Sequence, residues 1–529
     1  MTVQKTMVSG KQKMFLFWAA LAVIAALGGF LFSYATPDGL ALVNDSVGYI
    51  NGAQNLADGR GYVRNSGGDE LKPITNFPPL YSLVLSVLLR SGLQPFEAAW
   101  WLGFILYLVN LVLVGLLGWQ VTGSRGFGAA AAAVFGALEP FFRFQLAAMS
   151  EPVFFLTHFL GLLAAGRYFQ TRKTRWIVLA GVLASLSYLT RYIGAALLIS
   201  VGLAVLVFIP GWRQRLRAAA WFVVGAVPGL AVWTLRNVNT TGSAANRQME
   251  FHSIPQAKIQ EGIETFWGWL LPDRLRLVER AYPLLAVLLV VAAGVLLGWA
   301  VWLVWKGFSQ TSRPGKTQPA LVWLQAIYPL VYLAVLTMTL MFLDASVNYE
   351  ARILAPPFFS VVLLIIAAAA ALWRQKLLVM RWVGAAGLLV MLLVFATDLR
   401  ETVNEFHRGG QGFADPAWTA RESIAMLREL PEAQTVYTNR PQAVLLLTGR
   451  GAYFLPTPIN PATGQPRENY TGDLEKIRQA VNDGKAVVAV FDVTALKENP
   501  EEAQWMNDVT AGITLITPVE NDLLLGWRP

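Results

Sequence analysis

Apolar segments of near membrane-spanning length constrain this chain more than any other feature. Eleven can be drawn, at residues 14–34, 98–120, 127–146, 151–168, 176–190, 192–210, 218–236, 281–305, 319–343, 353–373 and 382–398. A spanning helix needs about 20 apolar residues, and the stretch 176–210 can also be divided differently. Only 14% of the residues are charged, whereas soluble domains carry roughly 25%. The pattern predicts a polytopic α-helical membrane protein with about 11 transmembrane helices.

Charges in the connections between these segments predict an orientation. With the N-terminus inside, the inner connections carry 17 Lys and Arg residues and no acid, and all 33 acids fall on the other side. Positive residues concentrate in cytoplasmic loops. The sequence therefore predicts a multi-pass membrane protein with a cytoplasmic N-terminus and an extracytoplasmic tail. The inner connections also explain the net charge of +9, so no nucleic-acid partner is expected.

Composition divides the chain at residue 398. Residues 1–398 are the predicted transmembrane domain, which includes a long first outer loop at 35–97. Within the outer loops, 77–93 and 254–271 are predicted as helices. Residues 399–529 contain short apolar runs that alternate with helix-like stretches, which indicates a small extracytoplasmic α/β domain. No catalytic motif is found in this tail.

Ionisable residues are absent near the midpoints of the predicted segments and gather at their outer ends. They are Glu139, Arg143, Glu151, Arg191, Arg236, Asp344 and Arg352. Buried charge in lipid is costly and commonly marks function. The outer interface is where water-soluble and lipid-anchored groups can meet, so this polar layer is the predicted place of chemistry.

Two acids of this region are candidates for catalysis. Asp45 lies in the NDS sequence that heads a predicted helix of the first loop. Either Asn44 or Asp45 is the N-cap of this helix, or Asp45 is a general base for a sugar hydroxyl. Glu151 lies in the sequence MSEP, where it either favours a helix N-terminus or forms the second acid of a pair.

Three arginines, Arg191, Arg236 and Arg352, are expected on the same face as the two acids. An arginine at headgroup level can simply extend its charge out of the lipid. The guanidinium is also suited to a phosphate, by charge and by bidentate geometry. Their common level with two acids favours a phosphate site.

Short motifs follow one another along the predicted outer face. They are Asp45-x3-Tyr49-x5-Asn55-Leu56-x2-Gly59-x-Gly61-Tyr62, Pro78-Pro79-Leu80-Tyr81, Glu151-Pro152, Leu189-Thr190-Arg191, and Arg352 ahead of Pro356-Pro357. In these motifs, over residues 10–400, the chain resembles the polyprenyl-phosphate-sugar-dependent glycosyltransferases of the GT-C superfamily. That superfamily includes the family 39-like protein O-mannosyltransferases and the lipid A aminoarabinose transferases.

The resemblance implies a GT-C-like enzyme that moves a sugar, with inversion, from a polyprenyl-phosphate donor to a lipid, glycan or protein acceptor. It implies Asp45 as general base and Glu151 as second acid. Donor-phosphate contacts are expected from Arg191, Arg352, Arg236 and Lys72. Sugar or acceptor contacts are expected from Tyr49, Asn55, Tyr62 and Tyr349. The chain departs from many relatives at Asn44, where they have an acid, and at Phe77, where they have Lys.

Two other functions stay open at this point: a lipid or glycan transporter or flippase, and a membrane-anchored binding protein that acts through its tail. The lack of midplane charge argues against ion coupling. No cofactor is expected with certainty, and a divalent metal stays open. The chain has no Cys, and its three His residues show no metal-ligand spacing.

Overall fold

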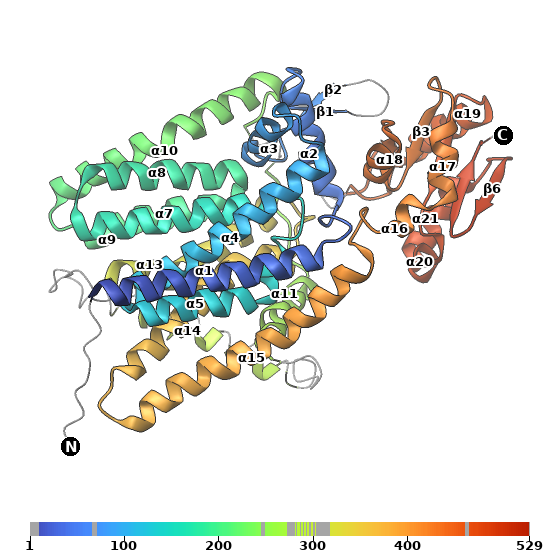
Figure 1. Cartoon of the computed structure of the whole chain (residues 1–529). Helices are drawn as coiled ribbons and strands as arrows, with labels where there is room; N and C mark the ends of the chain where they lie inside the picture. Colours follow the sequence, from blue (N-terminus) through green and yellow to red (C-terminus); the bar gives the residue numbers. More distant parts are fainter. Residues whose placement is uncertain are drawn as a thin grey trace.

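The structure is a computed structural model that describes residues 10–65, 71–244, 249–271, 318–460 and 465–527, with scattered residues between 281 and 302. A bundle of helices makes up most of the molecule, and a small α/β domain is attached at one end of it (Figure 1). We call this the domain end of the bundle; α1 begins at the opposite end. The predicted combination of a helical membrane domain and a small C-terminal α/β domain is confirmed.

Seven of the described helices are long and apolar enough to cross a membrane. They are α1 (Gly10–Ala35), α4 (Pro95–Thr122), α7 (Glu151–Thr171), α10 (Trp212–Thr241), α13 (Pro319–Phe342), α14 (Ala351–Trp373) and α15 (Leu378–Gly409). Two shorter apolar helices, α8 (Thr174–Thr190) and α9 (Ala195–Phe208), match the predicted segments 176–190 and 192–210. The predicted segment 281–305 lies largely outside the described residues, so the count of about 11 is not confirmed.

The predicted segment 127–146 is broken in the structure. Helix α5 (Arg125–Ala137) ends at Leu138, whose backbone is extended, and the short helix α6 (Glu139–Arg143) follows with a proline in its first turn. Proline has no N–H to donate and suits the start of a helix. The break sets Arg143 beside Glu139 and beside Glu405 of α15.

The first loop folds into a compact layer at the domain end. It contains α2 (Asn44–Ala57), the hairpin of β1 (Val63–Asn65) and β2 (Leu71–Pro73), and α3 (Leu80–Arg90), which matches the helix predicted in 77–93. A Cβ on Gly52 would lie 2.8 Å from side-chain atoms of both Tyr62 and Ile74. Glycine at this position therefore lets the hairpin region pack closely on α2.

The C-terminal domain is built on a five-stranded sheet of order β4-β3-β5-β7-β6. Its strands are β3 (Thr435–Thr438), β4 (Tyr453–Phe454), β5 (Ala486–Val490), β6 (Ile516–Val519) and β7 (Asp522–Leu525). The first three are parallel and the last two pair antiparallel. All residues of β5 are buried, as expected of an apolar central strand. Strand β7 was not predicted.

Helices pack around this sheet. They are α16 (Pro416–Thr419), α17 (Glu422–Glu429), α18 (Pro441–Thr448), α19 (Tyr470–Asn482), α20 (Val493–Glu498) and α21 (Pro500–Thr510). In the second loop, α11 (Gln256–Gly268) matches the helix predicted in 254–271.

The membrane and tail regions join through α15 and the turn that follows it. Helix α15 continues past residue 398 to Gly409, so the division drawn from composition falls within a helix. Backbone hydrogen bonds then link Leu42 of the first loop to Gln411 (3.1 Å) and Phe413 (2.7 Å). Gly412 has a φ of +62°, and a Cβ there would lie 2.2 Å from the Leu42 carbonyl oxygen. The close approach requires glycine.

Candidate active site

Four charged side chains meet at the domain end, although they are far apart in sequence. Asp45 comes from the first turn of α2, Glu151 from the start of α7, Arg191 from the junction after α8, and Arg352 from the start of α14. Arg352 Nη1 donates to Asp45 Oδ2 at 2.6 Å, and Arg352 Nε lies 3.7 Å from Glu151 Oε1. Arg191 pairs with the same Glu151 oxygen. We call these four residues the charge cluster.

Asp45 is not the N-cap of α2. Val43 occupies the cap position, and its N–H donates to the Ser46 hydroxyl at 3.0 Å. The Asp45 side chain makes no capping bond and instead pairs with Arg352. It stays 29% exposed, so the carboxylate remains within reach of a ligand. The N-cap interpretation of the sequence was therefore wrong.

Glu151 is the most enclosed member of the cluster. Its side chain is 2% exposed and lies between two guanidinium groups. Oε1 forms ion pairs with both Arg191 and Arg352, whereas Oε2 has no hydrogen-bond partner among the described residues. Just before it, the Ser150 hydroxyl accepts a hydrogen bond from Tyr49 OH at 3.0 Å, which ties α2 to the start of α7.

Arg352 is held in place by the segment that precedes α14. In that segment, Asp344 Oδ1 accepts two hydrogen bonds from Ser346, at 3.0 and 2.6 Å. Lys258 of α11 donates to two carbonyl oxygens of the same segment, at 2.6 and 2.7 Å, and burial lowers the pKa of its ammonium group. Tyr332 of α13 donates to the Ile353 carbonyl at 2.6 Å. Contacts from α11 and α13 thus hold the backbone in place on both sides of Arg352.

The structure gives Arg236 a different role from the predicted phosphate contact. Its guanidinium donates to the carbonyl oxygens of Ile74, at 2.6 Å, and Tyr62, at 2.7 Å. A third hydrogen bond goes to the neighbouring Asn237 side chain. These bonds use the guanidinium fork to fasten the first loop to α10, and Arg236 does not join the charge cluster.

Asn55 and Tyr62, predicted to contact sugar, hold the first loop together instead. Asn55 is 1% exposed, and its Nδ2 donates to the Val63 carbonyl at 3.0 Å and to Asn65 Oδ1 at 3.1 Å. The Tyr62 hydroxyl donates to the Phe77 carbonyl at 3.3 Å, and its ring is buried. Neither side chain is accessible to a ligand.

The other predicted contact residues lie outside the charge cluster. Tyr49 is buried, and its hydroxyl is used by Ser150. The Tyr349 hydroxyl lies 2.9 Å from Thr337 Oγ1. Lys72 is exposed on β2, where it pairs in register with Arg64.

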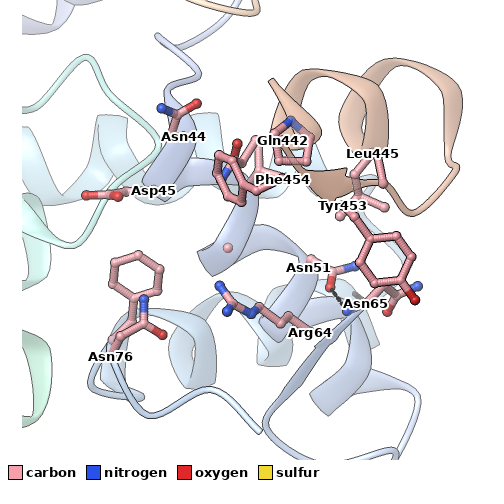
Figure 2. A pocket seen from close by; sticks show the side chains of 15 residues that line it. Asn44, Asp45, Asn51, Arg64, Asn65, Asn76, Gln442, Leu445, Tyr453 and Phe454 are labelled. Carbon is pink, nitrogen blue, oxygen red and sulfur yellow. Dashed lines mark hydrogen bonds between the residues drawn. The ribbon is translucent and has the colours of Figure 1, made fainter. Parts of the chain in front are cut away.

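A cavity of about 360 Å³ opens beside Asp45, between the first loop and the C-terminal domain (Figure 2). We call it the interdomain cavity. Its polar and aromatic lining consists of Asn44, Asp45, Asn51, Arg64, Asn65, Asn76, Phe77, Gln442, Tyr453 and Phe454. Among these residues, only Asp45 was predicted from the sequence to contact a ligand. The frequent asparagines of the first loop were a signal that could have indicated a polar site.

Within the described part of the chain, no group of three or more His, Asp or Glu side chains is arranged to hold a metal ion. What the charge cluster does offer is a partly exposed carboxylate beside two guanidinium groups. Such a set can accept a proton and bind an anion close together.

Comparison with solved structures identifies the fold. The archaeal oligosaccharyltransferase AglB from Archaeoglobus fulgidus, in complex with an inhibitory peptide and a dolichol-phosphate, matches with a TM-score of 0.56 and 11% identity, over 94% of this chain and 72% of its own. The arabinofuranosyltransferase AftD from Mycobacteria matches with a TM-score of 0.50 and 14% identity, over 89% of this chain and 36% of its own. ArnT from Cupriavidus metallidurans, bound to undecaprenyl phosphate, matches at 0.47 and 14%, over 98% of both chains.

AglB and AftD are GT-C glycosyltransferases, so the chain has a GT-C-like fold, as its motifs implied. At these identities the likeness concerns the fold alone. No protein-family model and no curated protein sequence matches the chain.

Proposed function

We propose that this protein is an integral-membrane glycosyltransferase that moves a sugar from a polyprenyl-phosphate donor to an acceptor. The observation that carries the proposal is the charge cluster, in which two guanidinium groups meet a partly exposed carboxylate at one end of a GT-C-like bundle. The dolichol-phosphate in the AglB complex supports a lipid phosphate as the donor class. A lipid donor would also supply activated sugar where nucleotide sugars are not normally available.

The reaction we propose is a single displacement. The acceptor hydroxyl attacks the anomeric carbon, its proton passes to the Asp45 carboxylate, and the bond from the anomeric carbon to the phosphate oxygen breaks. The polyprenyl phosphate leaves as an anion, and the anomeric centre is inverted. Because phosphate is a stable leaving group, less acid assistance is needed than in glycoside hydrolysis.

Arg191 and Arg352 bind the donor phosphate in this mechanism and stabilise the charge that grows on it as the bond breaks. Glu151 positions both arginines, because its buried carboxylate lies between them. In this proposal Glu151, the second acid implied by the resemblance, acts through the two arginines. Arg352 also contacts Asp45, so donor phosphate and base would lie on either side of one guanidinium.

We place this chemistry on the outer face of a bacterial plasma membrane. The support is the charge pattern, since the acids avoid the predicted inner connections. Some of these basic connections lie together at the end of the bundle away from the C-terminal domain. There, Arg374 donates to the Thr122 carbonyl, and Arg172 donates to the Phe208 carbonyl at 3.0 Å. Basic residues are typical of the cytoplasmic end.

The decisive experiment replaces the proposed base. Asp45→Asn keeps the size of the side chain but cannot accept the proton, so transfer from a labelled polyprenyl-phosphate sugar should fall by about 100-fold or more. Asp45→Glu should recover part of the rate. The assay uses the full chain in nanodiscs, with thermal unfolding followed in parallel. A stable Asp45→Asn protein with near wild-type turnover would refute the assignment.

A second experiment addresses the phosphate site. Arg352→Lys keeps the charge but loses the bidentate fork, so kcat/KM for the lipid donor should fall by about 10-fold or more. Arg143→Lys is the matched control, because Arg143 lies at the domain end but pairs with Glu139 and Glu405 instead. Equal donor kinetics for the two variants would remove Arg352 from the phosphate site.

A further inference from the structure

The interdomain cavity is formed jointly by two parts of the chain that are separated by about 400 residues in sequence. Helix α2 and the β1 region supply one wall, and α18 and β4 of the C-terminal domain supply the other (Figure 2). Its volume of about 360 Å³ lies within the roughly 300–1,000 Å³ of small-molecule sites. Because Asp45 lies on its edge, a group bound there would be next to the proposed base.

The first-loop wall presents amide donors in a fixed orientation. Asn55 donates to the side-chain oxygens of Asn51 (3.3 Å) and Asn65 (3.1 Å), and the Asn65 backbone N–H donates to Asn51 Oδ1 at 2.8 Å. The oxygens of both amides are therefore occupied. Their NH₂ groups make no hydrogen bond to a described residue and remain available to a ligand.

Three further polar side chains of the lining have no partner within the described residues. They are Asn76 of the first loop, Gln442 of α18, and Arg64 of β1. Partial desolvation by the surrounding residues lowers the pKa of the Arg64 guanidinium, although Arg64 stays exposed to solvent. Figure 2 shows Arg64 extending from the first-loop side toward the middle of the lining residues. Arg64 is exposed and the other two are half-buried, so a ligand that enters the cavity can reach all three.

Aromatic rings complete the lining. Phe77 lies on the first-loop side, and Tyr453 and Phe454 lie on the tail side. The Tyr453 ring stacks on Tyr437 with centroids 5.5 Å apart, which fixes its plane. Phe454 is 62% exposed, unusual for a phenylalanine in a folded domain. Together the walls offer apolar ring faces and a surplus of hydrogen-bond donors.

We propose that the interdomain cavity is the acceptor site and that the acceptor is a saccharide. A sugar ring has apolar C–H faces that suit aromatic side chains, and an edge of hydroxyl groups that both donate and accept. Carboxamides and a guanidinium match that edge. An acyl chain would leave these donors unpaired, which is costly. The inference rests on the proposed glycosyltransferase function and adds the acceptor class and a role for the C-terminal domain.

The acceptor class is tested by the linkage of the product. Full-length protein in nanodiscs is incubated with labelled polyprenyl-phosphate sugars and a whole cell-envelope extract, and the labelled product is isolated. A glycosidic bond to another sugar supports the inference. A bond to a Ser, Thr or Asn side chain, or to a lipid hydroxyl, overturns it while leaving the proposed function intact. Absence of any labelled product and of any released polyprenyl phosphate contradicts the proposed function itself.

The location is tested on the tail side of the cavity, away from the charge cluster. Gln442→Ala should raise the KM for the extracted acceptor by about fivefold, and Phe454→Ala should raise it by about tenfold. The KM for the donor should stay unchanged, because neither side chain contacts the charge cluster. Gln479→Ala, at an exposed position of α19 outside the lining, is the matched control. Wild-type acceptor KM in both cavity variants would show that the acceptor binds elsewhere.

Discussion

Buried carboxylates paired with arginine are found both in the membrane region and in the tail. The charge cluster contains Glu151, which is 2% exposed, and the tail cluster contains Asp522, which is 4% exposed. In the tail, Asp522 Oδ1 accepts from Arg421 at 3.1 Å and from the Asp492 backbone N–H at 3.0 Å. Its second oxygen accepts from Ser423 at 2.6 Å.

The two clusters differ in how completely the oxygens of the buried carboxylate are hydrogen-bonded. Both oxygens of Asp522 have donors, whereas Glu151 Oε2 has none among the described residues. A fully hydrogen-bonded polar network stabilises one conformation. An unsatisfied buried polar atom costs free energy, and such atoms are retained mainly where a function needs them. The charge cluster also opens beside a cavity through Asp45. We infer that the tail cluster maintains the fold and that the charge cluster serves chemistry.

Glu151→Gln should have the largest effect of the changes that separate the two clusters. The substitution keeps the shape but removes the negative charge between two guanidinium groups, so Arg191 and Arg352 repel each other and lose their positions. Transfer should fall by about 100-fold, and stability should drop by about 3 kcal/mol. Turnover and thermal unfolding are measured on the same nanodisc sample.

The control for Glu151→Gln is Glu139→Gln. Glu139 lies in the same polar layer and pairs with Arg143, outside the charge cluster. Turnover should stay close to that of the wild type. An equal fall in both variants would mean that any acid of this layer supports activity, and the special role of Glu151 would be lost.

Asp522→Asn should act on stability alone. In the variant, an NH₂ group replaces one of the two carboxylate oxygens and so faces hydrogen-bond donors instead of accepting from them. The ion pair with Arg421 is also lost. We expect the free energy of unfolding to fall by about 1–3 kcal/mol, with unchanged turnover at temperatures where the tail stays folded. Asp483→Asn, in an exposed pair with Lys485, should change stability by less than about 1 kcal/mol. Loss of turnover in folded Asp522→Asn would end the distinction between the clusters.

The members of the charge cluster could be named from the sequence for a physical reason. Glu151, Arg191 and Arg352 each lie next to an apolar segment, and Asp45 lies in the loop that follows the first one. Alternating spans bring such ends to one level. Counting the predicted membrane crossings is therefore enough to predict which polar residues lie at the same face of the membrane. The motif resemblance then selected among the polar residues at that level.

The roles of Asn55, Tyr62 and Arg236 could not be obtained in the same way. Their hydrogen bonds go largely to other parts of the first loop and its backbone carbonyls, and no local pattern shows where a loop will fold back. The lining from the C-terminal domain was missed for a related reason. Gln442 lies in the lining because the tail docks on the first loop, through the turn at Gly412 and through the packing of α18 on α2.

The smallest effect is expected from Tyr49→Phe, which decides between the sequence interpretation of this residue and the structural one. Burial raises the pKa of Tyr49, so the hydroxyl stays protonated and donates to Ser150 at 3.0 Å. Its removal should cost about 1 kcal/mol of stability and change turnover by less than about threefold, because Tyr49 only ties α2 to α7. Tyr81→Phe is the control, since the Tyr81 ring packs edge-on against Tyr49 but its hydroxyl bonds to no described residue. If Tyr49→Phe instead raised the KM for donor or acceptor by tenfold at unchanged stability, Tyr49 would be a sugar contact. The side of α2 that carries Tyr49 would then belong to the ligand-binding surface.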